Sequence, residues 1–490
     1  MANTKFQEVE KYAAPDGSYQ LIPFNIDKID EESFFISNVS GDYCFITPTE
    51  LDDLVNKELS KDANVYKELK SRHFLYEDNY DLPLDILSTR YRTKKSSLNS
   101  FTALHMFVVT LRCDLSCSYC QVSRQTQAAP DKYDMSEDTA DKFIDMMFKS
   151  PSTHYKVEFQ GGEPLVNFKL IKYIVGRVNH INETANKNVE FVIATNLNLI
   201  NDEILKFVKE HTIYLSTSLD GPQHVHDHNR NKDSHSKVTA NIKKVQDEVG
   251  HDYVAALMTT TNKSLQHPNE IVDEYVRLGL NQIFLRAISP YGFALRSTNA
   301  KYATNEFIRF YKEALDYIIN LNKQGTVITE VYATIILSKI LTPFTHNFVD
   351  LLSPAGTGIA AISYNYDGDI YASDESRMLA EAKDDTFKLG NVHENSYKEI
   401  FLSPTLIEMI NSSCLEANPM CNDCAYNPYC GTDPVHNHQT QGDVQGIMPQ
   451  SGFCTKNMAV IKLLLSYIKE NDPETMDVFY SWVNRIPLES

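Results

Sequence analysis

Short apolar runs alternate with amphipathic helical patterns through the middle of the chain. The six runs are LHMFVVTL (104–111), YKVEFQ (155–160), VEFVIAT (189–195), IYLSTSLD (213–220), YVAALMTT (253–260) and QIFLRAI (282–288). Each is rich in β-branched and aromatic residues, and a segment of helical period follows each one. Such alternation predicts parallel strands joined by right-handed crossovers. We therefore expect an α/β fold over residues 101–325, as a partial (β/α)6 barrel, with a doubly wound open sheet as the competing architecture.

Three further strand-like runs precede this region. They are YQLIPFNIDKID, SFFISNV and DYCFI, and a helical pattern follows them. Thr47 can cap that helix, Pro48 suits its first position, and Glu50 completes a capping box. Residues 1–100 are predicted to form a small α+β module, and residues 326–490 a third part that is rich in cysteine.

The composition excludes several classes of protein. Of 490 residues 42% are hydrophobic, and the formal net charge of −19 argues against nucleic-acid binding. No window of about 18 apolar residues is present, so no membrane span is expected. The first residues, MANTKFQEVEKY, lack the apolar core of a signal peptide. A cytoplasmic location is therefore expected, where thiols stay reduced.

The cysteines fall into two groups, which favours metal binding over a disulfide framework. Cys44 stands apart in the apolar stretch YCFI and is predicted to be a buried core residue. Cys113, Cys117 and Cys120 follow the first barrel strand with the spacing C-x3-C-x2-C. Three thiolates are one short of the four ligands that a structural zinc ion or a fully ligated iron–sulfur cube needs. A cube on these three cysteines would keep one iron open.

Polar residues stand at the ends of the other predicted strands. In parallel α/β folds these ends meet at one edge of the sheet, where the chemistry is placed. They are expected to surround one cavity together with the cysteines. The residues concerned are Gln160 to Pro164, Thr195, Asn196, Ser216, Ser218, Asp220, Thr259, Thr260 and Arg286.

The cysteine spacing after the first strand, and GGEP (161–164) after the second, resemble the radical S-adenosylmethionine (SAM) superfamily. The resemblance implies a partial TIM barrel of radical SAM type, with a [4Fe-4S] cluster on Cys113, Cys117 and Cys120. In that family SAM chelates the open iron. An electron from the cluster then splits SAM into methionine and a 5′-deoxyadenosyl radical, which abstracts a hydrogen atom.

The same resemblance implies which residues contact SAM. Glu163 would accept hydrogen bonds from the SAM ammonium, and the two glycines would let backbone groups approach the ligand. The segment HDHNR resembles the HDxxR segment of the peptide-modifying branch, and an aromatic ring between the cysteines would cover the adenine. The predicted SAM-binding set is Tyr119, Gly161, Gly162, Glu163, Asn196, Ser218, Asp220 and Arg230.

The last part of the chain resembles the SPASM extension of radical SAM peptide maturases. C-x2-C-x5-C and a later cysteine imply an auxiliary [4Fe-4S] cluster on Cys421, Cys424, Cys430 and Cys454. Where that family has ligands for a second auxiliary cluster, this sequence has Ser353, Ser373 and Pro434, so one auxiliary cluster is expected. Cys414 is left over, as a spare, a replacement ligand or a free thiol. Four cysteines also suit zinc, and His436 and His438 are expected to form hydrogen bonds around the cluster loop.

The first hundred residues resemble the winged-helix peptide-recognition element of such maturases, in which a leader peptide adds a strand to the sheet. The alternative is an α+β cap that only shields the barrel. The segment RYRTKK (90–95) is then expected to be a solvated basic linker.

Along its length the chain most resembles the radical SAM maturase (B component) of His-Xaa-Ser peptide-modification systems, through TALHMFVVTLRC, YCQVSRQ, VEFQGGEPL and CAYNPYCGTDPVHNHQTQGD. This implies a ribosomally made peptide substrate, an electron donor of the flavodoxin or ferredoxin type and a second maturase, with neither nucleic acid nor membrane as partner. The alternatives are an anaerobic sulfatase maturase, and a non-catalytic iron–sulfur or zinc scaffold that presents peptides. The sequence identifies no catalytic acid or base.

Overall fold

The computed structural model describes residues 19–77, 82–99, 101–295, 301–345 and 348–486. The prediction that the first residues form no signal peptide concerns residues that lie outside these ranges. Among the described residues, none of the helices has the length and apolar character needed to cross a membrane.

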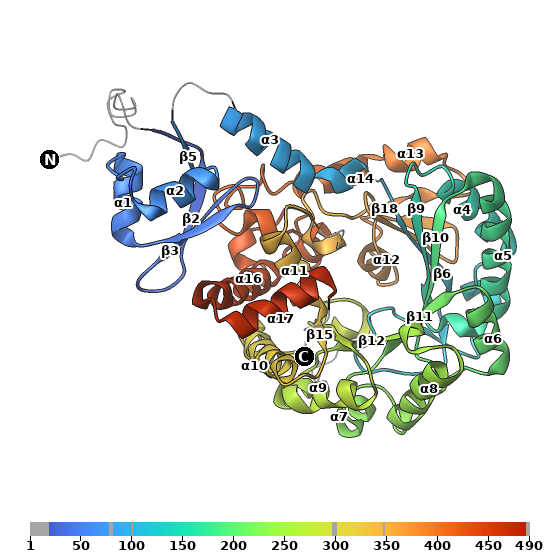
Figure 1. The fold of residues 1–490 in the computed structure, drawn as a ribbon. Coiled ribbons are helices and arrows are strands. Elements are labelled where there is room, and N and C mark those ends of the chain that lie inside the picture. The colour runs from blue at the N-terminus through green and yellow to red at the C-terminus, as the bar shows by residue number, and fades with distance from the viewer. Residues whose placement is uncertain (1–18, 78–81, 100, 296–300, 346–347, 487–490) are drawn as a thin grey trace.

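Six parallel strands form the centre of the molecule and follow one another in space in chain order (Figure 1). A doubly wound sheet would reverse that order partway, so the competing architecture is wrong and the partial barrel is confirmed. The strands are β6 (Leu104–Thr110), β9 (His154–Gly161), β10 (Asn188–Thr195), β11 (Ile213–Ser218), β12 (Val254–Thr259) and β14 (Leu285–Arg286).

Helices connect these strands and form the outer layer of the barrel in Figure 1. Ser136 caps the first, α4, by accepting a hydrogen bond from the Thr139 N–H, as its pattern predicts. The apolar faces of these helices, except that of α7, pack into one continuous core with the sheet. The helices are α4 (Glu137–Met147), α5 (Phe168–Ala185), α6 (Asp202–Glu210), α7 (Gln223–Asn229), α8 (Ser234–Glu248), α9 (Pro268–Arg277) and α10 (Thr304–Lys323).

The carboxyl-terminal part extends the same sheet beyond β6. Its strand β16 (Ala361–Tyr364) pairs in parallel with β6, and β17 (Asp369–Tyr371) and β18 (Lys388–Asn391) follow in antiparallel pairs. The third part is therefore joined to the barrel by backbone hydrogen bonds. Its remaining elements are β15 (Thr329–Glu330), which pairs with β13 (Gln282–Ile283), α11 (Val331–Leu341), α12 (Asp374–Ala380), α13 (Tyr397–Phe401), α14 (Pro404–Ser412), α15 (Pro434–Gln441), α16 (Gly452–Glu470) and α17 (Pro473–Asn484).

The amino-terminal module has a three-stranded antiparallel sheet in the order β2-β3-β4, with its own small core that includes the buried Cys44. Thr47 and Glu50 form the expected capping box at its first helix. The module contains β1 (Gln20–Leu21), β2 (Phe24–Lys28), β3 (Phe34–Asn38), β4 (Tyr43–Ile46), α1 (Pro48–Asn56), α2 (Asn64–Ser71) and β5 (Leu75–Tyr76), and α3 (Leu82–Lys94) leads out of it.

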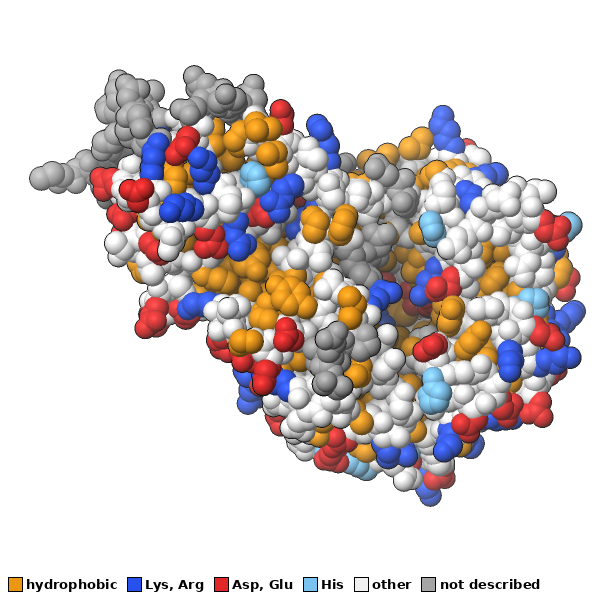
Figure 2. Space-filling view, viewed as in Figure 1, with side chains coloured by type: hydrophobic (Ala, Val, Ile, Leu, Met, Phe, Trp, Pro, Cys, Tyr) orange, Lys and Arg blue, Asp and Glu red, His pale blue; other side chains and the backbone are white. Residues whose placement is uncertain are grey.

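The predicted solvated linker at residues 90–95 is wrong. Most of it belongs to α3, and Arg90 donates to Asp42 at 2.5 Å within the module. Lys94 is buried, and Lys95 forms an ion pair with Glu416 at 2.5 Å. The basic residues therefore fasten the module to the rest of the chain. Figure 2 shows hydrophobic side chains gathered at the same junction.

Candidate active site

The first three clustered cysteines lie in the loop that follows β6. The loop contains two short paired strands, β7 (Arg112–Cys113) and β8 (Gln125–Thr126). Cys113, Cys117 and Cys120 line one cavity of about 260 Å³, which the carboxyl ends of β9, β10 and β11 also line. The structure thus brings the cysteines and the polar strand ends to one mouth of the barrel.

Burial raises the pKa of the Cys113 and Cys117 thiols above the ordinary value for cysteine. To ligate a metal these thiols must lose their protons, and burial opposes that loss. Arg230 favours that release at Cys117, because its Nη1 lies 3.9 Å from the sulfur and its charge lowers the pKa of the thiol.

Gly161 and Gly162 are required by the packing of the cysteine loop. A Cβ on Gly161, which has φ of 134°, would lie 1.9 Å from the Thr110 carbonyl oxygen, and one on Gly162 would lie 2.4 Å from that of Leu111. The Gly162 N–H donates to Thr110 O at 2.8 Å. These glycines let the end of β9 pack against the backbone just before Cys113, in addition to any approach to a ligand.

The Glu163 carboxylate is turned into the protein and does not line the cavity. It is 1% exposed and accepts hydrogen bonds from Leu165 N–H (3.0 Å), Thr195 Oγ1 (2.7 Å) and Asn196 N–H (2.8 Å). Burial raises its pKa to about 7, although these donors lower it. The geometry makes Glu163 a positioning residue for the turn after β10, and gives no support to its predicted contact with the SAM ammonium.

Asp220 is likewise fully buried behind the cavity. It accepts hydrogen bonds from Tyr119 Oη at 2.8 Å and from Arg230 Nε at 3.1 Å, and the guanidinium carbon lies 5.4 Å from the Tyr119 ring centroid. Tyr119 and Arg230 themselves line the cavity. Asp220 therefore holds two cavity residues in place, and the structure does not bring it to the wall as predicted.

Asn196 and Ser218 line the cavity. Asn196 Nδ2 donates to Asp114 at 2.7 Å, which joins the turn after β10 to the cysteine loop. Thr217 and Arg124 also belong to the residues that line the cavity. The Thr217 Oγ1 and Arg124 Nε atoms are buried and have no hydrogen-bond partner among the described residues.

The sequence did not predict that residues of the carboxyl-terminal part line this cavity. Asp374 and Met378 of α12 line it, and the fully buried Arg377 forms an ion pair with Asp374 at 2.7 Å. Nothing in their local pattern marks these residues, because α12 reaches the barrel mouth only through the pairing of β16 with β6.

The second cysteine group lines a separate cavity of about 340 Å³, formed by Cys421, Cys424, Cys430 and Cys454. The first three lie in one irregular segment, and Cys454 is in the first turn of α16. Burial raises the pKa of Cys421 to about 12 and that of Cys424 to about 11. Ile26 and Asp27 of β2 line the same cavity, so the amino-terminal module forms part of its wall.

The cysteine sulfurs of neither group have the close spacing of a tetrahedral zinc site. Tetrahedral zinc with bonds of ~2.3 Å places its sulfurs about 3.8 Å apart, and within the described residues no three cysteine sulfurs lie within 4.8 Å of one another.

The other predicted positions have structural roles. Ser353 Oγ donates to Glu416 at 2.5 Å, Ser373 caps α12, and Pro434 begins α15. Cys414 lies 3.7 Å from Glu416 and lines neither cysteine cavity.

The two histidines do not surround the cluster loop as expected. His438 Nε2 lies 2.8 Å from Asp384. His436 lines a third cavity, of about 180 Å³, together with three half-buried carboxylates. These carboxylates, Asp350, Glu375 and Asp433, have pKa values raised by burial and by one another, to about 6, 7 and 7.

The comparisons with known proteins agree with this geometry. The model of the radical SAM superfamily matches residues 107–263. A cysteine-type anaerobic sulfatase-maturating enzyme of Clostridium novyi is 25% identical over 337 residues, which cover 65% of this chain and 83% of that protein. The uncharacterized protein MJ0907 of Methanocaldococcus jannaschii is 31% identical over 184 residues, 37% of this chain. That match spans 61% of MJ0907, less than two thirds of its length.

Two solved structures share the fold. Native anSMEcpe with bound AdoMet superimposes with a TM-score of 0.62 at 17% identity, over 75% of this chain and 100% of that one. Streptococcus suis SuiB bound to its precursor peptide SuiA gives a TM-score of 0.51 at 13% identity, over 88% and 98%. A [4Fe-4S] cluster with SAM is the cofactor that the matched domain implies, and the carboxyl-terminal cysteines fit an auxiliary cluster. Residues 107–263 thus match the model of the radical SAM superfamily, and the chain shares its fold with anSMEcpe and SuiB.

Proposed function

We propose that this protein modifies a ribosomally made peptide by radical SAM chemistry, and that Cys113, Cys117 and Cys120 hold the SAM-binding cluster. One observation carries the proposal: three cysteines share a cavity with the carboxyl ends of the parallel strands. We further propose that Cys421, Cys424, Cys430 and Cys454 hold the auxiliary cluster.

A bound cluster with SAM would supply one electron and a 5′-deoxyadenosyl radical that removes a hydrogen atom from a substrate C–H bond. The chain's own residues would bind the ligand and orient the groups around it. Asp220 fixes the Tyr119 ring and the Arg230 guanidinium, and Arg230 places a positive charge beside Cys117. Asn196 and Ser218 offer polar groups toward the ligand, and α12 contributes Asp374 and Met378 to the cavity wall.

The peptide class rests on relatives and on the resemblance to His-Xaa-Ser maturases. SuiB is described with a precursor peptide and anSMEcpe with peptides. We propose that a leader peptide adds a strand to the module sheet, in which β2 and β4 are the edge strands. A reductant of the flavodoxin or ferredoxin type and a second maturase complete the proposed cytoplasmic system.

The second candidate is an anaerobic sulfatase maturase, favoured by the match to 83% of the Clostridium novyi enzyme. Both candidates need the same barrel chemistry and differ in substrate, so a comparison of substrates separates them.

The test uses the full chain, purified and reconstituted anaerobically. We expect about eight irons, four for each of two cubes, and 5′-deoxyadenosine when SAM and dithionite are added. A precursor rich in His-x-Ser should change mass, while a sulfatase-derived cysteine or serine peptide should not. Modification of the sulfatase peptide alone would select the second candidate. Absence of SAM cleavage in protein with full iron would overturn the enzyme proposal.

A further inference from the structure

Two buried lysines lie beside the auxiliary cysteines. Lys94, at the end of α3, is 5% exposed, and Lys339, on α11, is 3% exposed. Among the residues that the structure describes, no carboxylate forms an ion pair with either ammonium group. A buried ammonium group is costly to keep charged, and an anion close to it favours the charged form.

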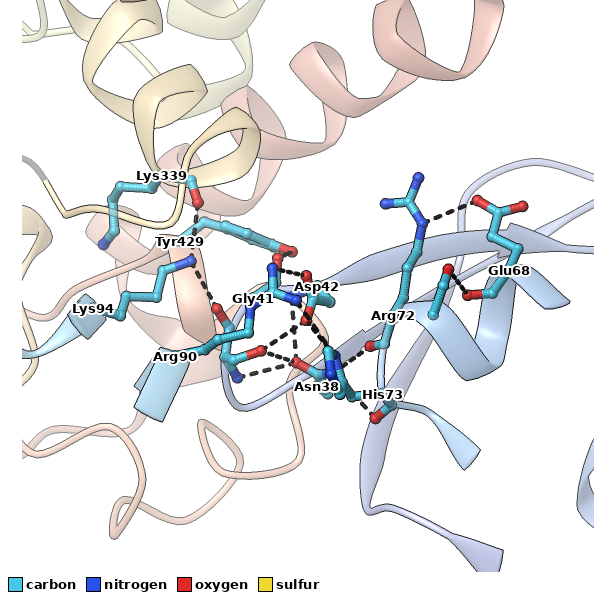
Figure 3. A network of polar contacts seen from close by, with 12 residues as sticks. Asn38, Gly41, Asp42, Glu68, Arg72, His73, Arg90, Lys94, Lys339 and Tyr429 are labelled. Carbon is cyan, nitrogen blue, oxygen red and sulfur yellow. Dashed lines mark hydrogen bonds and ion pairs between the residues drawn. The ribbon is translucent and has the colours of Figure 1, made fainter. Parts of the chain in front are cut away.

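The hydrogen bonds of these lysines form a chain from the amino-terminal module to the cluster loop, and Figure 3 shows the part of it around Lys94. Lys94 Nζ donates to Ser40 O at 3.2 Å and to Lys339 O at 2.9 Å. Lys339 Nζ in turn donates to Leu351 O at 2.5 Å and to Cys430 O at 3.1 Å. The second ammonium is therefore in direct contact with the backbone of a proposed cluster ligand.

The module holds the other side of the same loop. Asn25 Nδ2 donates to Asn422 O at 2.8 Å and to Cys424 O at 3.1 Å, and Ser37 Oγ donates to Ala425 O at 2.6 Å. Tyr429 Oη donates to Gly41 O at 2.9 Å, as Figure 3 shows. The loop is thus clamped between the module and α11, and the lysines have little freedom to turn toward solvent.

A cube held by four thiolates carries a net negative charge, and reduction makes it more negative. A cation fixed at short range in a low-dielectric surrounding stabilises the reduced form more than the oxidised form. Glu416 lines the same cavity as Lys94, Lys339 and Cys430, and a negative cluster on Cys430 would add a second anionic group beside the two lysines.

We propose that Lys339, supported by Lys94, is the buried counter-charge of the auxiliary cluster and raises its reduction potential. This rests on the proposed cluster at Cys421, Cys424, Cys430 and Cys454. Lys339 acts through the cluster and is a positioning residue, since it touches only backbone oxygens.

The experiment measures the midpoint potential of the auxiliary cluster by EPR during a redox titration. The protein is the full chain with Cys113, Cys117 and Cys120 changed to Ala, so that the auxiliary cluster alone gives the signal. In that background Lys339→Met should shift the potential to more negative values, by about tenfold in the one-electron equilibrium constant, or ~59 mV. Lys339→Arg, which keeps the charge, should retain the original potential.

The matched control is Lys67→Met, which removes the same charge from an exposed position on α2 of the module. Solvent and salt screen that charge, so the potential should stay unchanged. If Lys339→Met does not yield folded protein, Lys94→Met takes its place, with a smaller shift expected in the same direction.

An unchanged potential in a Lys339→Met protein that keeps its auxiliary iron would overturn the inference, and so would an equal shift in Lys67→Met. An unchanged potential in Lys94→Met, where that variant is the substitute, has the same meaning. Zinc without iron in the background protein would instead overturn the proposed auxiliary cluster, so the two failures are distinguishable.

Discussion

The two cysteine sites are built in different ways. The loop of Cys113, Cys117 and Cys120 lies within one run of strand and helix units, and its neighbours come mostly from consecutive strand ends. The auxiliary site combines the cysteine segment, α16 and β2 of the amino-terminal module. The first site therefore depends on the order of the barrel strands, and the second depends on how separate parts of the chain pack together.

The largest expected effect separates the two sites completely. Changing Cys113, Cys117 and Cys120 together to Ala should abolish SAM cleavage and leave about four of eight irons. Iron analysis and detection of 5′-deoxyadenosine check this, with Cys414→Ser as the control, because Cys414 lines neither cavity. Remaining SAM cleavage in the triple variant would contradict the assignment.

The second-largest effect is expected from removing an aromatic contact between the amino-terminal module and the loop of the auxiliary cysteines. Phe35 is fully buried, and its ring stacks on Tyr426 at 5.8 Å between centroids. Phe35→Ala should lower the free energy of unfolding by about 3–5 kcal/mol and loosen the auxiliary iron, because it opens a cavity at this junction. Thermal unfolding and iron release to a chelator measure both effects.

The control for that variant is Phe344→Ala, since Phe344 is 62% exposed and the change should matter little. An auxiliary cluster as stable as in the original protein after Phe35→Ala would mean that the module does not support the second site.

Acid is expected to lower the stability of the barrel by protonating His226. The Nδ1 atom of His226 accepts a hydrogen bond from the Asp220 N–H at 3.2 Å. Burial lowers the pKa of His226 from 6.5 to about 4. The unfolded chain therefore takes up a proton that the folded chain excludes, and the stability present above pH 6.5 is lost as the pH falls toward 4. At pH 5 the loss is about 2 kcal/mol.

Unfolding curves at pH 7 and pH 5 measure that loss. His226→Gln keeps an acceptor without a titrating ring, so its stability should fall less between these pH values. An equal fall in both proteins would assign the acid sensitivity to other groups.

The smallest expected effect concerns a single hydrogen bond. Ser37→Ala removes the donor to Ala425 O, which should cost about 1 kcal/mol and slightly hasten loss of auxiliary iron. The control is Ser71→Ala, because that exposed hydroxyl bonds only within its own turn. Equal iron loss in the two variants would remove Ser37 from the support of the site.

The sequence predicted the barrel because its signal is local. Six apolar runs with intervening helical patterns fix the strand order, and the strand ends follow from it. Gly161 and Gly162 were recognised for the same reason, although the backbone of residues 110 and 111 explains their identity better than a ligand alone.

The local sequence pattern does not determine the direction of a side chain or the packing between distant parts of the chain. Glu163 and Asp220 do not line the cavity, because their carboxylates accept hydrogen bonds from buried N–H and O–H donors, and their predicted contacts with SAM stay predictions. The basic segment at 90–95 was interpreted from charge alone, and only the tertiary structure shows that Lys94 is buried. Burial of a lysine against carbonyl oxygens leaves no mark on the local pattern.

The pairing of β16 with β6 has a consequence for synthesis of the chain. Ala361 pairs with Leu104, so one edge of β6 stays unpaired until a strand about 250 residues later in the chain has been synthesised. At ribosomal rates that interval is roughly 10–50 s, during which an apolar strand edge next to the loop of Cys113 stays open to other chains. A nascent chain would therefore need protection at this edge until residues 361–364 emerge.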